Sequence, residues 1–173
     1  LHIKSNSIRF DQPYYVRKEW SEAHGKSVLE EGDVLLVQTG DIGQAAVVSE
    51  EFAGCNCHAL IILAPVRHDV CGEWLSWVFN SDYGRNSLLA IQTGALHPHL
   101  NCGNVKRLAI PIPPLEEQRT IIEALGSKLE RFGGLTAEAE YVISLLKERR
   151  SALIAAAVTG QIDVRGLLSE EAA

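Results

Sequence analysis

Cysteine and histidine side chains, which are the residues best suited to hold a transition metal, occur in two short runs of this 173-residue chain. The first run is Cys55-Asn56-Cys57-His58, in which a single residue separates the two thiols. This spacing is shorter than that of the common zinc sites. Strand alternation instead places both thiols on one face with Ala59 and Ile61. The run therefore predicts small, buried thiols, with a zinc site as the alternative.

The second run, His97-Pro98-His99, has no acidic or cysteine neighbour and is a poor ligand set for a metal. Cys71 and Cys102 bring the cysteines to four, which would allow three disulfide pairings. The first residues lack the basic and then apolar pattern of a secretory signal. We therefore expect four free thiols in a reducing compartment, the cytoplasm, and no bound metal.

Catalytic motifs are the next possibility. The sequence contains no nucleophile–histidine signature, P-loop, dinucleotide fingerprint or methyltransferase "NPPY"-type motif. Gly40-Asp41-Ile42-Gly43 is a Gly-x-x-Gly, but it lies between two apolar runs that are typical of strands, and a phosphate loop precedes a helix. The residues therefore predict a protein without a catalytic centre of its own.

The first part of the chain consists of short apolar runs bounded by glycine and proline, which are typical of strands in a sheet. We expect the sheet to be mixed. Its strands are expected at Val34–Val37, Ala45–Val48 and Ala59–Leu63. Trp74–Phe79 has the spacing of an amphipathic helix that ends within Ser81–Gly84, and Ser87–Ile91 predicts a further helical turn. No apolar run approaches the roughly 18 residues that a membrane-spanning helix requires.

After Pro113-Pro114, which suit a helix entry, apolar residues recur at alternating spacings of three and four. This a/d pattern continues for five heptads and predicts a coiled-coil helix that ends at Gly160. Gly133-Gly134 predict a kink or a break in it, since each glycine costs about 1 kcal/mol relative to alanine. The expected seam residues are Ile122, Leu125, Leu129, Phe132, Ala139, Ile143, Leu146 and Leu153, with Thr136, Arg150 and Ala157 in the same register.

A helix of about 44 residues is roughly 66 Å long. A domain of about 114 residues cannot cover the apolar stripe along all of that length, and no second helix of comparable length is expected in the chain. The partner helix must then come from another molecule, and a homodimer is the simplest arrangement.

These motifs together resemble the specificity subunits of type I restriction–modification systems. Ile110-Pro111-Ile112-Pro113-Pro114-Leu115-Glu116-Glu117-Gln118 is similar to the family's "IPLPPLEEQ" segment, and Leu145–Asp163 to its C-terminal signature. Gly32–Gly43 is similar to its "GDVLxxRTGxIG" hairpin, and Thr93–Asn101 to the loop before its last strand. The four segments occur in the family's order.

The resemblance implies an α+β fold, in which a target-recognition domain over residues 1–114 is followed by a coiled-coil helix over residues 115–160 and a tail over 161–173. Family members usually have two such domains and two helices, so this chain corresponds to a half-subunit. It begins with Leu, contains no Met, and lacks the family's opening strand and "LGD" element. We therefore expect several tens of residues of the recognition domain to be missing from its front.

By this resemblance, the chain reads double-stranded DNA, and a homodimer of it recognises a bipartite, palindromic site. Base edges are read by polar side chains on loops, and phosphates are held by lysine, arginine and backbone N–H groups. The candidate DNA-binding residues are Lys4, Asn6, Arg9, Gln38, Thr39, Asp41, Gln44, Thr93, His97, His99, Asn101, Lys106 and Arg107. Lys106 and Arg107 are phosphate candidates. For each residue, a solvated loop side chain is the simple alternative.

Partners follow from the same resemblance. The modification (methyltransferase) subunit would bind S-adenosylmethionine, so no cofactor is expected on this chain, and the restriction subunit would join through the complex. The net charge is −6, with 9 basic and 12 acidic residues over 1–114 and 7 and 10 over 115–173. Because phosphate neutralisation contributes much of DNA affinity, we expect weak binding by the chain alone and useful affinity with the modification subunit.

Two other functions fit the same residues. The chain could be a truncated remnant that dimerises or occupies modification subunits without reading DNA. It could also be the recognition module of another kind of DNA methyltransferase system.

Overall fold

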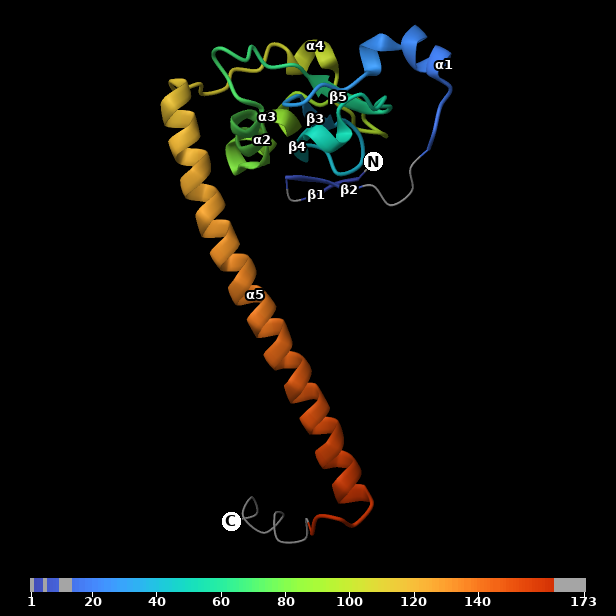
Figure 1. Cartoon of the computed structure of the whole chain (residues 1–173), viewed down its shortest axis with the longest axis vertical. Helices are drawn as coiled ribbons and strands as arrows, with labels where there is room; N and C mark the ends of the chain where they lie inside the picture. Colours follow the sequence, from blue (N-terminus) through green and yellow to red (C-terminus); the bar gives the residue numbers. More distant parts are fainter. Residues whose placement is uncertain (1, 5, 10–13, 164–173) are drawn as a thin grey trace. The chain divides into compact units, whose positions relative to one another are not determined.

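The computed structural model describes residues 2–4, 6–9 and 14–163. Internal contacts divide the chain into two units, Leu1–Glu123 and Ala124–Ala173, and each is treated by itself. The elements are β1 (His2–Lys4), β2 (Ser7–Arg9), α1 (Lys18–Ala23), η1 (Gly25–Ser27), β3 (Val34–Val37), β4 (Ala45–Val47), η2 (Glu50–Phe52), β5 (Leu60–Leu63), α2 (Gly72–Asn80), α3 (Asp82–Ala90), α4 (Cys102–Val105) and α5 (Leu115–Val158) (Figure 1). The fold is α+β, as predicted, and the three expected strands are present.

The central sheet has three strands in the order β4-β3-β5, and β1 pairs with β2 in a separate two-stranded sheet. Each of these pairs is antiparallel, so the prediction of a mixed sheet was wrong. The physical reason lies in the connections. The short loop over residues 38–44 joins β3 directly to β4 as a hairpin, whereas a parallel neighbour would need a long crossover. The predicted boundary at residue 114 remains a prediction.

The central sheet is covered on both faces. Strand alternation sends Val34 and Leu36 of β3 into a core with α2, α3 and α4, where Leu75, Phe79 and Leu88 pack. Leu35, between them, points to the opposite face and packs in a second core with residues that include Ile3 of β1. The uninterrupted apolar run of β3 is explained by this double burial, because Val34, Leu35 and Leu36 are buried on both faces of the strand.

The segment that leads into β5 departs from simple alternation. Ala59 has a φ of 66°, in the left-handed region, and its side chain is exposed. Cys57 consequently packs in the second core, while Ile61 packs in the first. The prediction that Cys55 and Cys57 share a face with Ala59 and Ile61 was therefore wrong. A single left-handed residue is enough to invert the alternation that follows it.

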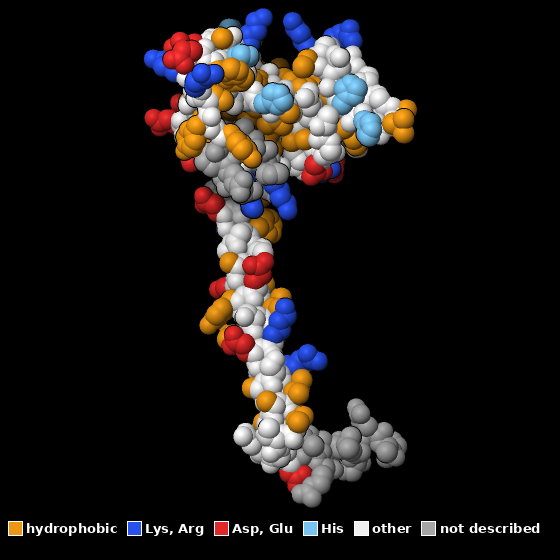
Figure 2. All heavy atoms as spheres, turned by 90° about the vertical axis from the view of Figure 1, so that its right-hand side faces the viewer, with side chains coloured by type: hydrophobic (Ala, Val, Ile, Leu, Met, Phe, Trp, Pro, Cys, Tyr) orange, Lys and Arg blue, Asp and Glu red, His pale blue; other side chains and the backbone are white. Residues whose placement is uncertain are grey.

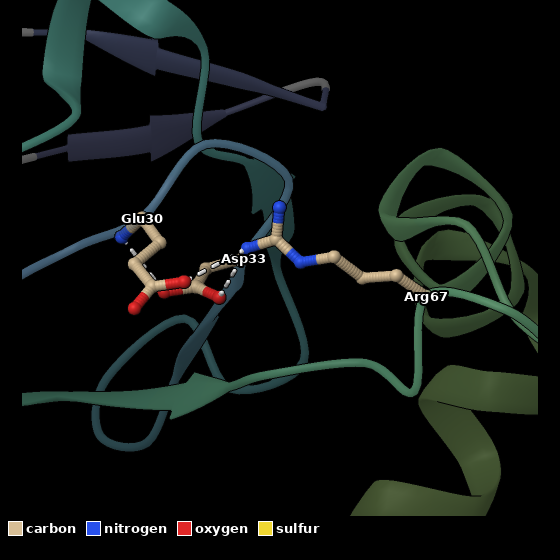
Figure 3. Close-up of polar contacts among 3 residues, drawn as sticks. All are labelled: Glu30, Asp33 and Arg67. Atoms are coloured by element: carbon tan, nitrogen blue, oxygen red, sulfur yellow. Dashed lines mark hydrogen bonds and ion pairs between the residues drawn. The ribbon is translucent and has the colours of Figure 1, made fainter.

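The turn before β3 is held by a buried carboxylate (Figure 3). Asp33 Oδ2 accepts the backbone N–H of Glu30 at 2.9 Å, and Gly32 adopts the positive φ of 84° that the turn requires. Arg67 Nη2 lies 3.2 Å from Glu30 Oε2 and 3.8 Å from Asp33 Oδ1, which accepts no hydrogen bond from the described residues. The guanidinium thus compensates a carboxylate that would otherwise be buried without a counter-charge.

The two central helices were predicted in part. α2 covers the expected Trp74–Phe79 stretch, and Ser81 ends it. The Ser81 hydroxyl also accepts the backbone N–H of Gly84 at 3.2 Å and so caps α3. Only a helical turn was predicted here, at Ser87–Ile91, whereas α3 is a longer helix that begins at Asp82.

The last helix, α5, begins directly after Pro113-Pro114, as predicted, and runs for 44 residues. It continues through Gly133 and Gly134, so the predicted break is absent, and Figure 1 shows no sharp bend there. Helix propagation is cooperative, and long helical segments on both sides keep the two glycines helical despite their poor propensity. Gly160 follows the helix with a φ of 74°, which agrees with the predicted stop. No helix in the described part of the chain is long and apolar enough to cross a membrane.

Candidate nucleic-acid interface

Two loops that are distant in sequence lie side by side in the unit Leu1–Glu123. The loop after β3 and the loop over residues 93–99 are joined by an antiparallel bridge between Thr39 and His99. The Leu100 N–H also donates to Gln38 O at 2.9 Å, and Leu100 itself is buried in the core. Gln38, Thr39 and His99, all predicted from sequence, are therefore brought to one edge, which we call the loop edge.

The second loop of this edge is internally pinned. Thr93 and His99 exchange two backbone hydrogen bonds of 2.9 and 2.8 Å. The His99 ring lies between two oxygens, with Nε2 3.2 Å from Thr93 Oγ1 and Nδ1 3.2 Å from His97 O. Leu96 is 90% exposed within this loop and was not among the predicted residues. A pinned loop that presents polar and apolar groups to solvent suits contact with another molecule.

A cleft of about 1110 Å³ adjoins the loop edge through Thr39. Four of the predicted residues line it: Lys4, Arg9, Thr39 and Asp41. Figure 2 shows lysine, arginine and histidine side chains around a hollow in which hydrophobic side chains are visible. The cleft is assembled from the β1–β2 hairpin, the segment around α1, the end of β3 with the loop after it, and the segment that leads into β5, so residues from four separate parts of the sequence meet in it.

The cleft also contains residues that sequence reasoning missed. Trp20 and His24 stack with ring centroids 3.9 Å apart. Asn56 Oδ1 accepts the Ser21 hydroxyl at 2.6 Å, and Asn56 Nδ2 donates to Ser27 Oγ at 2.9 Å. The missed lining residues are Tyr14, Val16, Trp20, His24, Ser27, Asn56 and His58. The sequence did carry one signal, because Tyr14 and Tyr15, both exposed, are separated only by Val16 from the basic pair Arg17-Lys18.

The charge of the cleft differs from that of the chain. Among the lining residues that the structure describes, the ionised side chains are Lys4, Arg9 and Asp41, which give one net positive charge, and His24 and His58 add to this when they are protonated. The chain as a whole carries −6. Positive charge in a concave surface attracts phosphates over several ångströms, even on an acidic protein.

Five predicted residues lie elsewhere or make structural bonds. Asn6 occupies the β1–β2 turn with a φ of 64°, and its Oδ1 accepts hydrogen bonds from Ser76 and, at 2.9 Å, from Asn80. Asn101 Oδ1 accepts the N–H of Gly103 at 2.8 Å and caps the short α4. Lys106 lines a separate apolar groove of about 890 Å³ beside β5, and Arg107 donates to Asn104 Oδ1 at 2.8 Å. Gln44 is half-buried at the start of β4.

The four cysteines are free thiols. Burial raises the pKa of Cys57, with a backbone hydrogen bond from Leu60 acting in the opposite direction. Among the residues that the structure describes, no group of three or more histidine, cysteine or acidic side chains is arranged to hold a metal ion.

The predicted seam of α5 lies open in the single chain. Phe132 is 63% exposed and Leu146 58%, and Leu129, Ile143 and Leu153 are about half exposed. A stripe of large apolar side chains in water over this length indicates a missing partner surface.

Comparison with known proteins was made for sequence and for structure. Residues 6–138 match the family model of the type I restriction modification DNA specificity domain. The specificity subunit of the type I restriction enzyme StySPI from Salmonella potsdam is 33% identical over 90 residues, which is 52% of this chain and 19% of the relative.

Two solved structures resemble the chain at 30% identity. The first is the HsdS subunit from Thermoanaerobacter tengcongensis, with a TM-score of 0.54 over 69% of this chain and 32% of that chain. The second belongs to work on complex assembly and conformational transition of the type I R-M system, with a TM-score of 0.59 over 73% and 34%. The chain thus covers between about a fifth and a third of the length of these relatives. Together with the open α5 seam and the charged cleft, the match over residues 6–138 shows that this chain belongs to the type I restriction modification DNA specificity domain family.

Proposed function

We propose that this chain is the non-catalytic DNA-recognition component of a type I restriction–modification complex, and that it acts in the cytoplasm as a half-subunit. The observation that carries the proposal is the positively charged cleft beside the loop edge, on a chain whose net charge is −6. The family match supports it, because the matched residues 6–138 include all of the described cleft lining except Ile3 and Lys4, and the first half of α5.

The cleft and the loop edge have different roles in DNA recognition. Lys4 and Arg9, on the β1–β2 hairpin, are placed to hold phosphates, which fixes the register of the protein on the duplex. Thr39, Thr93 and His99 present hydroxyl and imidazole groups on a pinned edge, where they can read base edges. Pinning lowers the conformational entropy that is lost on binding.

The rest of the complex supplies what this chain lacks. Two Lys/Arg side chains in the cleft neutralise few phosphates, so the chain alone should bind DNA weakly and gain affinity when the modification subunit adds contacts. The modification subunit would bind S-adenosylmethionine and transfer the methyl group. The restriction subunit would join through the complex.

The open α5 seam supports self-association. We expect two copies to pair along Leu129, Phe132, Ile143, Leu146 and Leu153, which removes these side chains from water. A two-fold dimer carries two recognition units, so its DNA target should be bipartite and palindromic.

The test is reconstitution. The full chain, mixed with its cognate modification subunit, should direct methylation to one sequence, which methylation sequencing of genomic DNA identifies. Arg9→Ala should then weaken binding of that DNA about tenfold and lower the salt slope by about one phosphate contact. The matched control is Arg131→Ala, which removes the same charge from the exposed surface of α5 and should change neither quantity.

A second function is favoured by one observation, which is that the described lining of the cleft carries only two Lys/Arg side chains. It would be a remnant that binds modification subunits without reading DNA. Stable complex formation without any sequence-specific methylation would support the remnant and contradict the recognition function.

A further inference from the structure

One polar residue of α5 is completely enclosed. Gln118, in the first turn of the helix, is 0% exposed and is the single buried residue of α5. Both it and its contacts lie within the unit Leu1–Glu123. A buried amide requires several hydrogen-bond partners, since an unpaired one loses its bonds to water.

The Gln118 amide is fully satisfied. Its Nε2 donates to Pro113 O at 2.7 Å and to Asp69 O at 2.8 Å. Its Oε1 accepts the Cys71 N–H at 3.1 Å and the Cys71 thiol at 3.3 Å. Both N–H donors and both acceptor positions are therefore in use. Asp69 and Cys71 belong to the segment that leads into α2, and Pro113 lies two residues before the start of α5.

The approach to α5 is held at two further points. The Tyr83 hydroxyl donates to Ala109 O at 3.0 Å, and Trp74 Nε1 donates to Pro111 O at 2.9 Å. Gln118 bonds to Pro113 O in the same segment. Side chains of α3, α2 and α5 thus hydrogen-bond to every second residue of the segment that enters the helix. Apolar contacts alone are non-directional, whereas hydrogen bonds require specific angles. This arrangement therefore constrains orientation as well as position.

We infer that Gln118 is a positioning residue, which fixes the direction in which α5 leaves the recognition unit and thereby the spacer length that a dimer accepts between its two half-sites. The inference rests on the proposed function for its link to DNA. The mechanical part of the inference, that Gln118 fixes the direction of α5, concerns this chain alone and is independent of that function.

The mechanical part is tested with the full chain. Spin labels carried by unnatural amino acids at Asn86 of α3 and Ser127 of α5 leave the four thiols in place, and dilution into unlabelled chain isolates the distance within one molecule. The variant is Gln118→Met, which keeps the side-chain volume and loses all four hydrogen bonds. The control is Glu123→Gln, on an exposed position of the same helix.

We expect one narrow distance distribution for the unchanged chain and for Glu123→Gln, and a broad one for Gln118→Met. A narrow distribution in Gln118→Met, at the unchanged distance, overturns the positioning role. If Gln118→Met does not fold by circular dichroism, Gln118→Glu replaces it, because a carboxylate still accepts the Cys71 N–H but donates to neither carbonyl. For this variant too, a broad distance distribution supports the positioning role, and a narrow one at the unchanged distance overturns it.

The functional part is measured by methylation of DNA in which the half-sites are separated by spacers of different length. We expect Gln118→Met to reduce the preference for the native spacer about tenfold, the factor that corresponds to the loss of about one net hydrogen bond. An unchanged spacer preference in a chain with a broadened distance distribution contradicts the link to spacing. If the unchanged chain directs no methylation, the proposed function fails, while the distance measurement still decides whether Gln118 positions α5.

Discussion

The two units of the molecule differ in how far their apolar side chains are buried. In the unit Leu1–Glu123, Leu35, Leu36 and Leu88 are fully buried between the sheet and its covering elements. In the unit Ala124–Ala173, the large apolar side chains of α5 from Leu129 onward remain at least 45% exposed. Since apolar burial is the main driving force of folding, the first unit holds the contacts for its own stability, and we propose that the second obtains them from a partner.

The difference also separates two tasks. The first unit collects polar residues from distant segments into a cleft and a loop edge, which requires a rigid core beneath them. The second unit offers one repeated apolar stripe and little else, as a seam and spacer would. A core substitution in the first unit should therefore change its stability, and a seam substitution in the second should change self-association. The reverse pattern would contradict this division.

The largest effect is expected in the core of the first unit. Leu36→Ala, at a position with 0% exposure, should lower the free energy of unfolding by about 2–5 kcal/mol, through lost burial and the cavity that remains. Leu96→Ala is the matched control, the same substitution at an exposed loop position, and should change it by less than about 0.5 kcal/mol. Urea denaturation measures both. Equal effects would show that the loop edge is as tightly packed as the core.

The second effect belongs to the helix. Leu146→Lys places a charge in the seam and should weaken self-association at least about a hundredfold, while the first unit keeps its unfolding midpoint. Glu148→Lys, two residues away and outside the a/d register, should leave association nearly unchanged. Light scattering over a concentration series measures association. A chain that is already monomeric without substitution, at micromolar concentration, would contradict the homodimer.

A smaller effect concerns pH. Because burial raises the pKa of Cys57, the folded chain keeps this proton when the unfolded chain loses it, above about pH 9. The resulting contribution to stability is complete below that pH and is lost as the pH rises further. Urea unfolding at pH 7 and pH 10 should therefore show a steeper loss of stability in the unchanged chain than in Cys57→Ala. Identical losses would mean that the thiol is hydrated in the folded chain.

The elements with strong local patterns could be predicted from sequence. β3, β4, β5, α2 and the heptad helix were expected near their observed bounds, because apolar periodicity and proline act over a few residues. Ala59 shows where this fails. Nothing in its residue type indicates a left-handed φ, and that one residue moved Ile61 to the other core.

The candidate site was predictable only within single segments. Thr39 and His99 were each selected as polar loop residues, and the bridge between them brings both to the loop edge. Their role in DNA binding stays a prediction. His24 escaped because nothing local marks it, and Asn56 and His58 were considered only as part of a possible metal run. The position of all three in one cleft depends on which distant segments the fold brings together. Gln118 was noticed as part of a motif, yet its burial and hydrogen bonds depend on Asp69 and Cys71, far earlier in the chain.

The smallest effect tests how closely a partner approaches α5. A Cβ at Gly133 or at Gly134 would meet nothing within 4 Å in the single chain, and neither residue has a positive φ. Alanine at either position should then stabilise the helix by about 0.5–1 kcal/mol, through propensity alone. Gly133 lies next to the seam and Gly134 on the opposite side, so a partner helix that packs tightly would reverse the sign at Gly133 and leave it unchanged at Gly134. Thermal melts of both variants, followed by circular dichroism at two concentrations, distinguish these cases. Equal stabilisation at both positions would show that the partner keeps its distance at this point, and that the seam is formed by the large side chains on either side of the glycines.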